Sequence, residues 1–311
     1  MTNSIEDVTR KAEVIMLVGS NPEEAHPVIG MQIRAAVERG CRLIVVDPRD
    51  IGLAAHADIH LKLRPGTNVA FANGIVNYLI QHELYDEDFV RERTEGFEIL
   101  AATVRRLYAR AGGGYLRHRS ARPRGRGEDV RGGDAAAIMY CLGVTEHSTG
   151  TDGVMALSNI AMISGNLGKP GGGVNPLRGQ NNVQGACDMG AGPDDLPGYQ
   201  KVADPEVVRR FEKAWGVALP RARGIKATEC FPAMIEGGIK GLFLFGEDPV
   251  RTDPDTHHVI RSLEALEFFV VDDLFMTETA KYADVILPGR SYAEKEGTFT
   301  NTERRVQRVR K

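Results

Sequence analysis

The chain has 311 residues, 42% of them hydrophobic, and its formal net charge of −3 argues against nucleic acid or an anionic membrane surface as the main partner. No apolar run approaches the ~18 residues of a spanning helix, and residues 1–7 lack the basic and apolar regions of a signal peptide. We therefore expect no direct membrane insertion, and the length is typical of two domains.

The near-neutral total hides an uneven charge distribution. Residues 105–131 contain nine arginines and, as acidic residues, only Glu128 and Asp129, which gives a local charge of +7 and leaves −10 for the other residues. Glycine is also frequent, at 35 residues, which is typical of many tight turns and close backbone approaches.

The four cysteines, Cys41, Cys141, Cys187 and Cys230, are far apart and form no C-x-x-C pair. This spacing argues against structural zinc and against an iron–sulfur cluster held wholly within this chain. Scattered single cysteines are typical of a reducing compartment, so we expect no metal ligand among them and a cytoplasmic location.

Strand and helix patterns alternate from the N-terminus. Residues 13–18 form a short apolar run typical of a buried parallel strand that ends at Gly19. Apolar residues recur at helical spacing from about residue 27, with Gly40 where a C-terminal cap belongs. The next predicted elements are a strand at 42–46 that ends at Asp47, a strand at 58–63, and a helix with Asn68 as its cap and Val69, Ala72, Val76 and Leu79 on its inner face.

A buried, almost wholly apolar helix is predicted at 152–165, and an unusual loop follows it. Within residues 175–185 the loop contains Arg178, much glycine and five amide side chains: Asn175, Gln180, Asn181, Asn182 and Gln184. Glycine lets the backbone approach a ligand, and amides offer donors and acceptors together. The loop is therefore a candidate binding segment.

The second half repeats the plan of the first. A strand at 241–245 ends at Gly246, a helix follows through residues 259–266, and a strand at 268–271 ends at Asp272. Glycine and acid are 28 residues apart in the first copy and 26 in the second, and an Ala-Asp pair opens another strand 11 and 12 residues later. We therefore predict an α/β fold of two related doubly wound, Rossmann-like domains at 1–178 and 179–290, with 291–311 starting a further segment.

Both glycine turns lie where open α/β sheets bind ligands, because helix N-termini there attract phosphate. Neither turn is a G-x-G-x-x-G, and Gly168-Lys169-Pro170 is not a P-loop. Asp47 and Asp272 end strands where a carboxylate commonly binds a ribose or a base edge. The alternative is that the turns are ordinary connections and the two acids only cap them.

Arg178 is the candidate for binding a small carboxylate or oxyanion, because its guanidinium is a planar fork, although a lone arginine is more often a surface or ion-paired residue. Among the eight histidines, only His147 lies in a sequence context that suggests a ligand. No H-E-x-x-H pair and no Ser–His–Asp arrangement is recognisable.

Seven runs of the sequence are distinctive when taken together. The most specific is GVNPLRGQNNVQGACDMG at 173–190, and the others are LVGSNPEEAHP at 17–27, VVDPR at 45–49, LRPGTN at 63–68, CLGVTEHSTG at 141–150, FGEDPVRTD at 245–253 and VDDLFMTETAKYADVILPG at 271–289. In these runs the sequence closely resembles the catalytic (alpha) subunit of molybdopterin-dependent formate dehydrogenase, of the molybdopterin oxidoreductase (DMSO reductase) family. The resemblance covers nearly the whole chain except residues 104–133.

The resemblance implies two molybdopterin guanine dinucleotides, one in each α/β domain, which supply four sulfur ligands to molybdenum or tungsten. It implies that Arg178 orients formate and that Gln180 lies near the pterins. Glu146 stands where the family has glutamine. The implied contacts to one dinucleotide are Gly19, Asn21, Asp47, Arg49, Pro65, Gly66, Asn68, Leu142, Gly143 and Glu146, and those to the other are Gly246, Glu247, Asp248, Thr252, Asp272 and Phe275.

The resemblance also implies parts that this chain lacks. In the family an N-terminal segment with an iron–sulfur cluster and the metal's cysteine or selenocysteine ligand lies before the position of Met1, and a pterin-capping domain lies beyond Lys311. We therefore expect a central fragment of a subunit that acts on formate with iron–sulfur or flavin electron-transfer subunits. Because an export signal would precede Met1, a cytoplasmic location is an expectation only.

The arginine-rich block at 105–131 departs from the family, which has an acidic helix-forming segment there. We interpret it as a compensated frameshift in a GC-rich gene, and we expect it to pack poorly; the alternative is a basic loop for an acidic partner. Resequencing the gene decides between the two. For the whole chain, the alternatives to formate dehydrogenase are another pterin oxidoreductase, such as a nitrate reductase, and a non-catalytic nucleotide-binding module.

Overall fold

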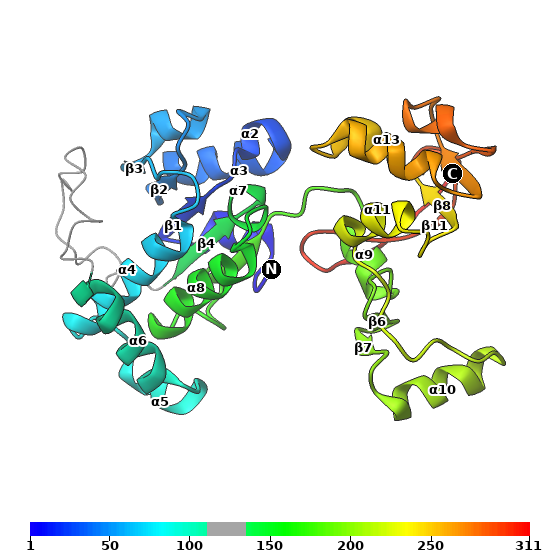
Figure 1. Ribbon diagram of the computed structural model, residues 1–311. Helices are drawn as coiled ribbons and strands as arrows, with labels where there is room; N and C mark the ends of the chain where they lie inside the picture. Colours follow the sequence, from blue (N-terminus) through cyan, green and yellow to red (C-terminus); the bar gives the residue numbers. More distant parts are fainter. Residues whose placement is uncertain (111–134) are drawn as a thin grey trace. The chain divides into compact units, whose positions relative to one another are not determined.

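The computed structural model describes residues 1–110 and 135–311 (Figure 1). It divides into two compact units, one of residues 1–181 with 302–304 and the other of residues 182–301 with 305–311. The expected boundary at residue 178 lies just before this division, and residues 291–311 are shared between the two units. Of the arginine-rich block, residues 105–110 belong to a helix and the remainder lies outside the described residues, so its expected poor packing stays untested there.

The first unit is built on a parallel five-stranded sheet with the order β3-β2-β1-β4-β5. This order confirms the doubly wound prediction, because strands are added on both sides of β1. Ligands in such sheets bind at the carboxyl ends of the strands where the order reverses, which here is between β1 and β4. The strands are β1 (Val14–Val18), β2 (Arg42–Val46), β3 (Ile59–Leu61), β4 (Ala136–Tyr140) and β5 (Gly173–Pro176).

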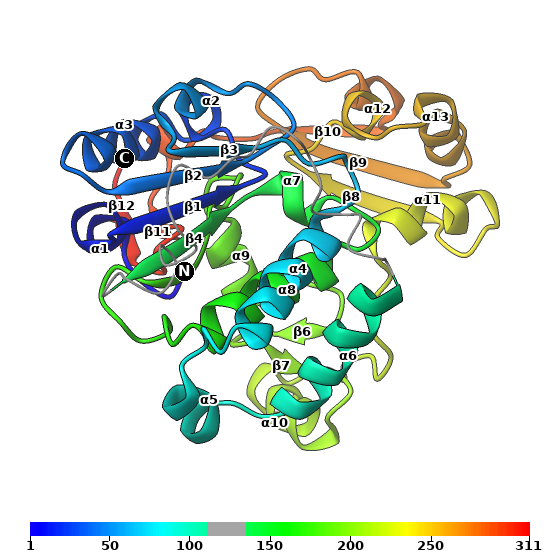
Figure 2. The same cartoon turned by 90° about the vertical axis from the view of Figure 1, so that its left-hand side faces the viewer.

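Helices cover both faces of this sheet (Figure 2). One face packs against α1 (Ile5–Lys11) and α3 (Pro27–Glu38), and the other against α4 (Asn68–Gln81), α6 (Phe97–Arg110) and α8 (Gly150–Ile163). Two apolar cores result, which explains why the strands are near-continuous apolar runs. The shorter helices are α2 (Pro22–Ala25), η1 (Gly52–His56), α5 (Glu87–Arg93) and α7 (Leu142–Thr145).

One predicted helix cap is wrong. Asn68 is the first residue of α4 and not its cap, which is Thr67, and the Thr67 side chain makes no capping hydrogen bond. The Asn68 Nδ2 instead donates to the Gly143 carbonyl oxygen at 3.0 Å. The side chain therefore links two loops at the carboxyl edge of the sheet.

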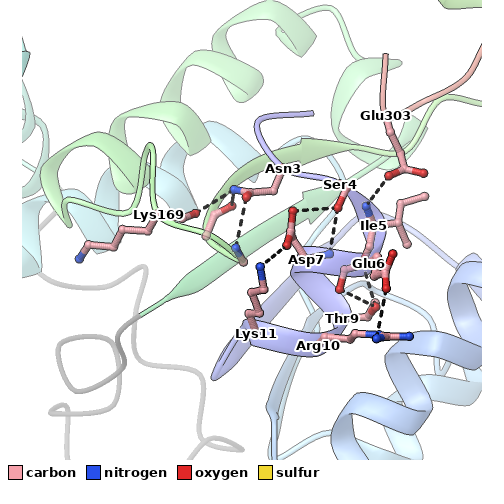
Figure 3. Close-up of polar contacts among 12 residues, drawn as sticks. Asn3, Ser4, Ile5, Glu6, Asp7, Thr9, Arg10, Lys11, Lys169 and Glu303 are labelled. Carbon is pink, nitrogen blue, oxygen red and sulfur yellow. Dashed lines mark hydrogen bonds and ion pairs between the residues drawn. The ribbon is translucent and has the colours of Figure 1, made fainter. Parts of the chain in front are cut away.

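Hydrogen bonds join the N-terminal segment to other parts of the first unit, including Glu303 (Figure 3). The Asn3 Nδ2 donates to the carbonyl oxygens of Lys169 at 3.0 Å and Gly172 at 2.8 Å. The Ile5 N–H donates to the Glu303 carboxylate at 3.0 Å, and Ser4 caps α1. These contacts hold the N-terminal segment against the loop that precedes β5 and join it to Glu303.

The second unit contains a parallel three-stranded sheet with the order β10-β9-β8. Its strands are β8 (Gly241–Phe245), β9 (Phe268–Asp273) and β10 (Val285–Pro288), and its core packs against α13 (Thr256–Glu264). The remaining elements are α9 (Val183–Asp188), β6 (Asp195–Leu196), β7 (Gln200–Lys201), α10 (Pro205–Trp215), α11 (Ala227–Ile235), α12 (Pro249–Thr252), η4 (Thr279–Tyr282), η5 (Tyr292–Glu294), β11 (Gly297–Thr300) and β12 (Val306–Val309).

The two sheets share the turn predicted from the sequence repeat. Gly19 and Gly246 both have a left-handed φ, +53° and +64°. The Gly19 N–H donates to the Val46 carbonyl oxygen at 2.9 Å, and the Gly246 N–H donates to that of Asp272 at 2.8 Å. Each glycine therefore ends the first strand of its copy against the second, in a conformation that favours glycine.

The Ala-Asp landmark also has one structural role in both copies. The Asp58 carboxylate accepts the Leu43 N–H at 2.8 Å, and the Asp284 carboxylate accepts the Phe269 N–H at 2.7 Å. Each Asp N–H donates back to the carbonyl oxygen of the same residue at 2.9 Å. The landmark sets the register of the third strand against the second, which accounts for its regular spacing.

We expect the substitution Asp58→Ala to lower the free energy of unfolding by about 1 kcal/mol, because the buried Leu43 N–H loses its acceptor. Asp58→Asn keeps an acceptor oxygen and is the matched control. Chemical denaturation measures both free energies. Equal stability of the alanine variant and the unchanged protein would contradict this role.

None of the helices within residues 1–110 and 135–311 is both long enough and apolar enough to cross a bilayer.

Candidate functional site

A cavity of about 440 Å³ opens at the carboxyl ends of β1, β2 and β4, where the strand order reverses. Ligand sites of doubly wound sheets lie at this position. The cavity brings together eight of the ten residues predicted to contact the first dinucleotide: Gly19, Asn21, Asp47, Arg49, Pro65, Asn68, Leu142 and Gly143. Gly66 and Glu146 do not line it; Gly66 lies in the turn after Pro65, and Glu146 is an exposed residue at the end of α7.

The floor of the cavity is a contact between two glycine backbones. The Gly143 N–H donates to the Gly19 carbonyl oxygen at 3.0 Å. A Cβ atom at Gly19 would lie 2.6 Å from the Gly143 carbonyl carbon, and one at Gly143 would lie 2.7 Å from the Gly19 Cα. Because backbone atoms cannot move aside cheaply, only glycine fits at both positions.

Two buried polar atoms in the turn after β1 have no hydrogen-bond partner among the described residues. They are the Ser20 Oγ and the Asn21 Oδ1, and both residues line the cavity. Buried polar atoms in proteins are nearly always hydrogen-bonded. These unpaired hydrogen-bonding atoms therefore suit a polar ligand.

Asp47 lies at the end of β2 with only 5% of its surface exposed. Its Oδ1 accepts the Arg49 N–H at 2.9 Å and lies 3.7 Å from the Arg49 Nε. Asp47 therefore caps the turn that follows β2, which was the alternative interpretation of this residue. It also lines the cavity. These two roles do not exclude one another.

The cavity also contains the histidine singled out in the sequence and several residues that were not predicted. His147 lines the cavity, with its Nε2 3.1 Å from the Gly143 carbonyl oxygen. The lining residues that were not predicted are Ser20, Glu24, Ala25, Val46, Pro48, Leu63, Arg64 and Cys141. All of them lie in or next to the turns already singled out. The sequence therefore indicated the turns that form the cavity, but it did not indicate these individual side chains.

A second cavity of about 330 Å³ lies on the same sheet beneath α4 and α8. Its lining is almost wholly apolar and includes Ile44, Phe71 and Ile138. A phosphate or a ribose needs polar partners, so this cavity does not suit a nucleotide.

The residues predicted to contact the second dinucleotide lie at the carboxyl ends of β8 and β9. The Thr252 Oγ1 donates to the Glu247 carboxylate at 3.2 Å. The Gly246 N–H donates to the Asp272 carbonyl oxygen, as described above. The Asp248 Oδ1 accepts the N–H of Thr279 at 3.0 Å and its hydroxyl at 2.6 Å, so it holds η4. Phe275 lies beyond β9 and is 76% exposed.

Arg178 and Gln180 follow β5, and both side chains are exposed. Because β5 is parallel to β4, Arg178 lies at the same edge of the sheet as the cavity. Leu177, immediately before it, is buried.

The Cys141 thiol bonds to the main chain next to Arg178. Burial raises the pKa of this thiol, so it stays protonated at neutral pH. Its Sγ donates to the Leu177 carbonyl oxygen at 3.0 Å.

Within residues 1–110 and 135–311, no group of three or more His, Cys, Asp or Glu side chains is placed to hold a metal ion.

The family model for molybdopterin oxidoreductases matches residues 1–311. The chain belongs to the molybdopterin oxidoreductase family. Its sequence is 49% identical over 319 residues to the F420-dependent formate dehydrogenase subunit alpha of Methanocaldococcus jannaschii, covering 100% of this chain and 46% of the relative. It is 41% identical over 309 residues to formate dehydrogenase H of Escherichia coli, covering 99% of this chain and 43% of the relative.

The fold has a solved counterpart in acetylene hydratase from Pelobacter acetylenicus, with a TM-score of 0.72, 21% identity, and coverage of 97% of this chain and 44% of that one. The likeness supports the mixed α/β fold with parallel sheets. The chain spans less than half the length of these relatives. Family membership implies a molybdopterin cofactor with molybdenum or tungsten.

Proposed function

We propose that this chain is part of a molybdenum or tungsten formate dehydrogenase that oxidises formate to carbon dioxide. The observation that carries the proposal is the placement of Arg178 at the same sheet edge as a polar, glycine-floored cavity. The names of the formate dehydrogenase relatives support the choice of substrate. A nitrate reductase remains the alternative that the assay below tests.

Two molybdopterin guanine dinucleotides are the proposed form of the cofactor. The cavity of the first unit would hold one of them through its glycine floor and the unpartnered Ser20 and Asn21 atoms, with Asp47 toward a ribose or base edge. The turns after β8 and β9 would hold the other. Gly66, Glu146 and Gln180 stay proposed contacts.

Arg178 is the proposed substrate residue. Its guanidinium presents parallel N–H donors that match both oxygens of a carboxylate, which fixes the plane of formate and leaves its C–H bond free. Oxidation of one formate releases one carbon dioxide, one proton and two electrons. The bound metal centre supplies the acceptor for these electrons, and the residues of this chain bind and orient the substrate.

The partners are also proposals. Electrons would leave through an iron–sulfur cluster carried outside these 311 residues and then through iron–sulfur or flavin subunits, in the cytoplasm. Because the relatives are more than twice as long, we propose that the 311-residue chain alone does not turn over formate.

Formate-dependent dye reduction, combined with metal analysis, tests this function. We expect the full-length subunit loaded with cofactor to reduce a viologen dye with formate and not to reduce nitrate, and the 311-residue chain to do neither. Nitrate reduction without formate oxidation would favour the alternative enzyme. Measurable formate oxidation by the short chain would contradict the proposed need for further segments.

The cavity gives a further prediction that needs no metal. We expect GDP, as a probe for the nucleotide half of the cofactor, to bind the 311-residue chain, and Asp47→Asn to weaken binding about tenfold because a hydrogen bond to a charged group is lost. The control is Asp50→Asn, since Asp50 is exposed, bonded to Lys62 and outside the cavity. Isothermal titration calorimetry measures both affinities, and equal affinities would contradict the role of Asp47.

A further inference from the structure

The main-chain polar groups around Arg178 are bonded to groups from distant parts of the chain. The Leu177 N–H donates to the Tyr140 carbonyl oxygen at 2.8 Å, and the Leu177 carbonyl accepts from the Cys141 Sγ. The Arg178 N–H donates to the Thr302 Oγ1 at 3.1 Å, and the Thr302 hydroxyl donates to the Pro176 carbonyl oxygen at 3.2 Å. These hydrogen bonds therefore fix the main chain of the loop after β5 at residues 176–178.

His26 completes this set through the carbonyl group of Arg178 itself. Its Nε2 lies 2.5 Å from the Arg178 carbonyl oxygen. A carbonyl oxygen only accepts hydrogen bonds, so the Nε2 carries the proton and His26 is the donor. The Nδ1 of the same ring is buried and has no partner among the described residues.

The backbone of His26 is itself held firmly. It lies between α2 and α3, where its N–H donates to the Pro22 carbonyl oxygen at 2.9 Å and its carbonyl accepts the Gly30 N–H at 3.0 Å. Helix α3 packs against the core of the sheet through Ile29 and Ile33. The imidazole therefore extends from a backbone that is fixed in place, and its hydrogen bond holds the Arg178 carbonyl group in one position.

We propose that His26 is a positioning residue, which fixes the Arg178 peptide group so that the guanidinium meets formate in one orientation. The inference rests on the proposed function of Arg178. Bidentate binding of a carboxylate needs a defined position and plane, and a displacement of about 1 Å at a reacting group costs about 10²-fold in rate. No sequence motif indicated this contact, because the two residues are 152 positions apart.

Three variants test the proposal. The side-chain nitrogen of His26→Gln reaches the position of the Nε2 and can donate to the carbonyl, whereas His26→Asn is too short and His26→Ala has no donor. We expect the asparagine and alanine variants to raise the KM for formate of the loaded enzyme about tenfold with a smaller change in kcat, and glutamine to restore most of it. If alanine prevents folding, the comparison of the two amides carries the test.

Hydrogen–deuterium exchange of the 311-residue chain gives a readout that does not depend on activity. We expect the amides of residues 177–181 to exchange faster in the asparagine variant than in the glutamine variant. Equal exchange in all variants would overturn the proposal, as would faster exchange with an unchanged KM. If Arg178→Lys also leaves the KM for formate unchanged, the proposed substrate role of Arg178 fails; if it raises the KM and the His26 variants do not, only the positioning role of His26 fails.

Discussion

Replacing Arg178 by lysine in the cofactor-loaded enzyme is expected to lower kcat/KM for formate by about 10²–10³-fold, the loss typical when one preorganised donor to a reacting oxygen is removed. A lysine keeps the charge but cannot present two parallel N–H groups to a carboxylate. Its ammonium therefore binds formate without fixing the plane of the molecule. Steady-state dye reduction at varied formate concentration measures the change.

The matched control is Arg209→Lys. Arg209 is an exposed arginine on α10, ion-paired with Glu206, and no proposed site contains it. We expect this variant to keep its kcat/KM within about twofold, as is usual for surface substitutions. A lysine at 178 that preserves kcat/KM for formate would remove Arg178 from the substrate site.

Gly143→Ala is expected to have the largest effect on stability of the substitutions considered. The added methyl group would lie 2.7 Å from both the Cα and the carbonyl oxygen of Gly19, so two backbones must separate at the cavity floor. We expect a loss of about 2–3 kcal/mol and a fall in Tm of the first unit of about 4–10 °C, from overpacking. Differential scanning calorimetry measures the transition.

Gly179→Ala is the control for this substitution. Among the described residues, no atom lies within 4 Å of a Cβ added at Gly179, and its φ is not in the left-handed region. We expect its Tm to change by less than about 2 °C, since only the backbone entropy of the unfolded chain differs. Equal Tm values for the two alanine variants would show that the glycine contact does not limit stability.

Much of the fold could be predicted, because the sequence indicates its strands both by apolar runs and by the residues that end them. Residues 42–46 and 241–245 are largely apolar runs that end at Asp47 and Gly246, and both strands have these bounds in the structure. The repeat of glycine and Ala-Asp added a long-range constraint that periodicity does not provide. Helix ends were less certain, since the Asn68 side chain bonds to Gly143 in another loop and not to its own helix.

The site could be predicted as a set of turns but not as a set of atoms. Parallel strands place their carboxyl ends at one edge, so Gly19 and Asp47 had to come close together. Gly143 follows β4, a strand that was not predicted, and it was expected at the site only from the resemblance. The Ser20 hydroxyl has no hydrogen-bond partner among the described residues. Its environment and the bond between His26 and Arg178 depend on side-chain directions that only the packed structure sets. For the second unit, the contact between Asp248 and Thr279 was likewise hidden in the sequence.

A structure of the cofactor-loaded, full-length enzyme with bound formate tests the central claim most directly. We expect nucleotide density in the cavity floored by Gly19 and Gly143, and both formate oxygens within hydrogen-bond distance of the Arg178 guanidinium. Formate bound away from Arg178, or a cavity without nucleotide, would contradict it.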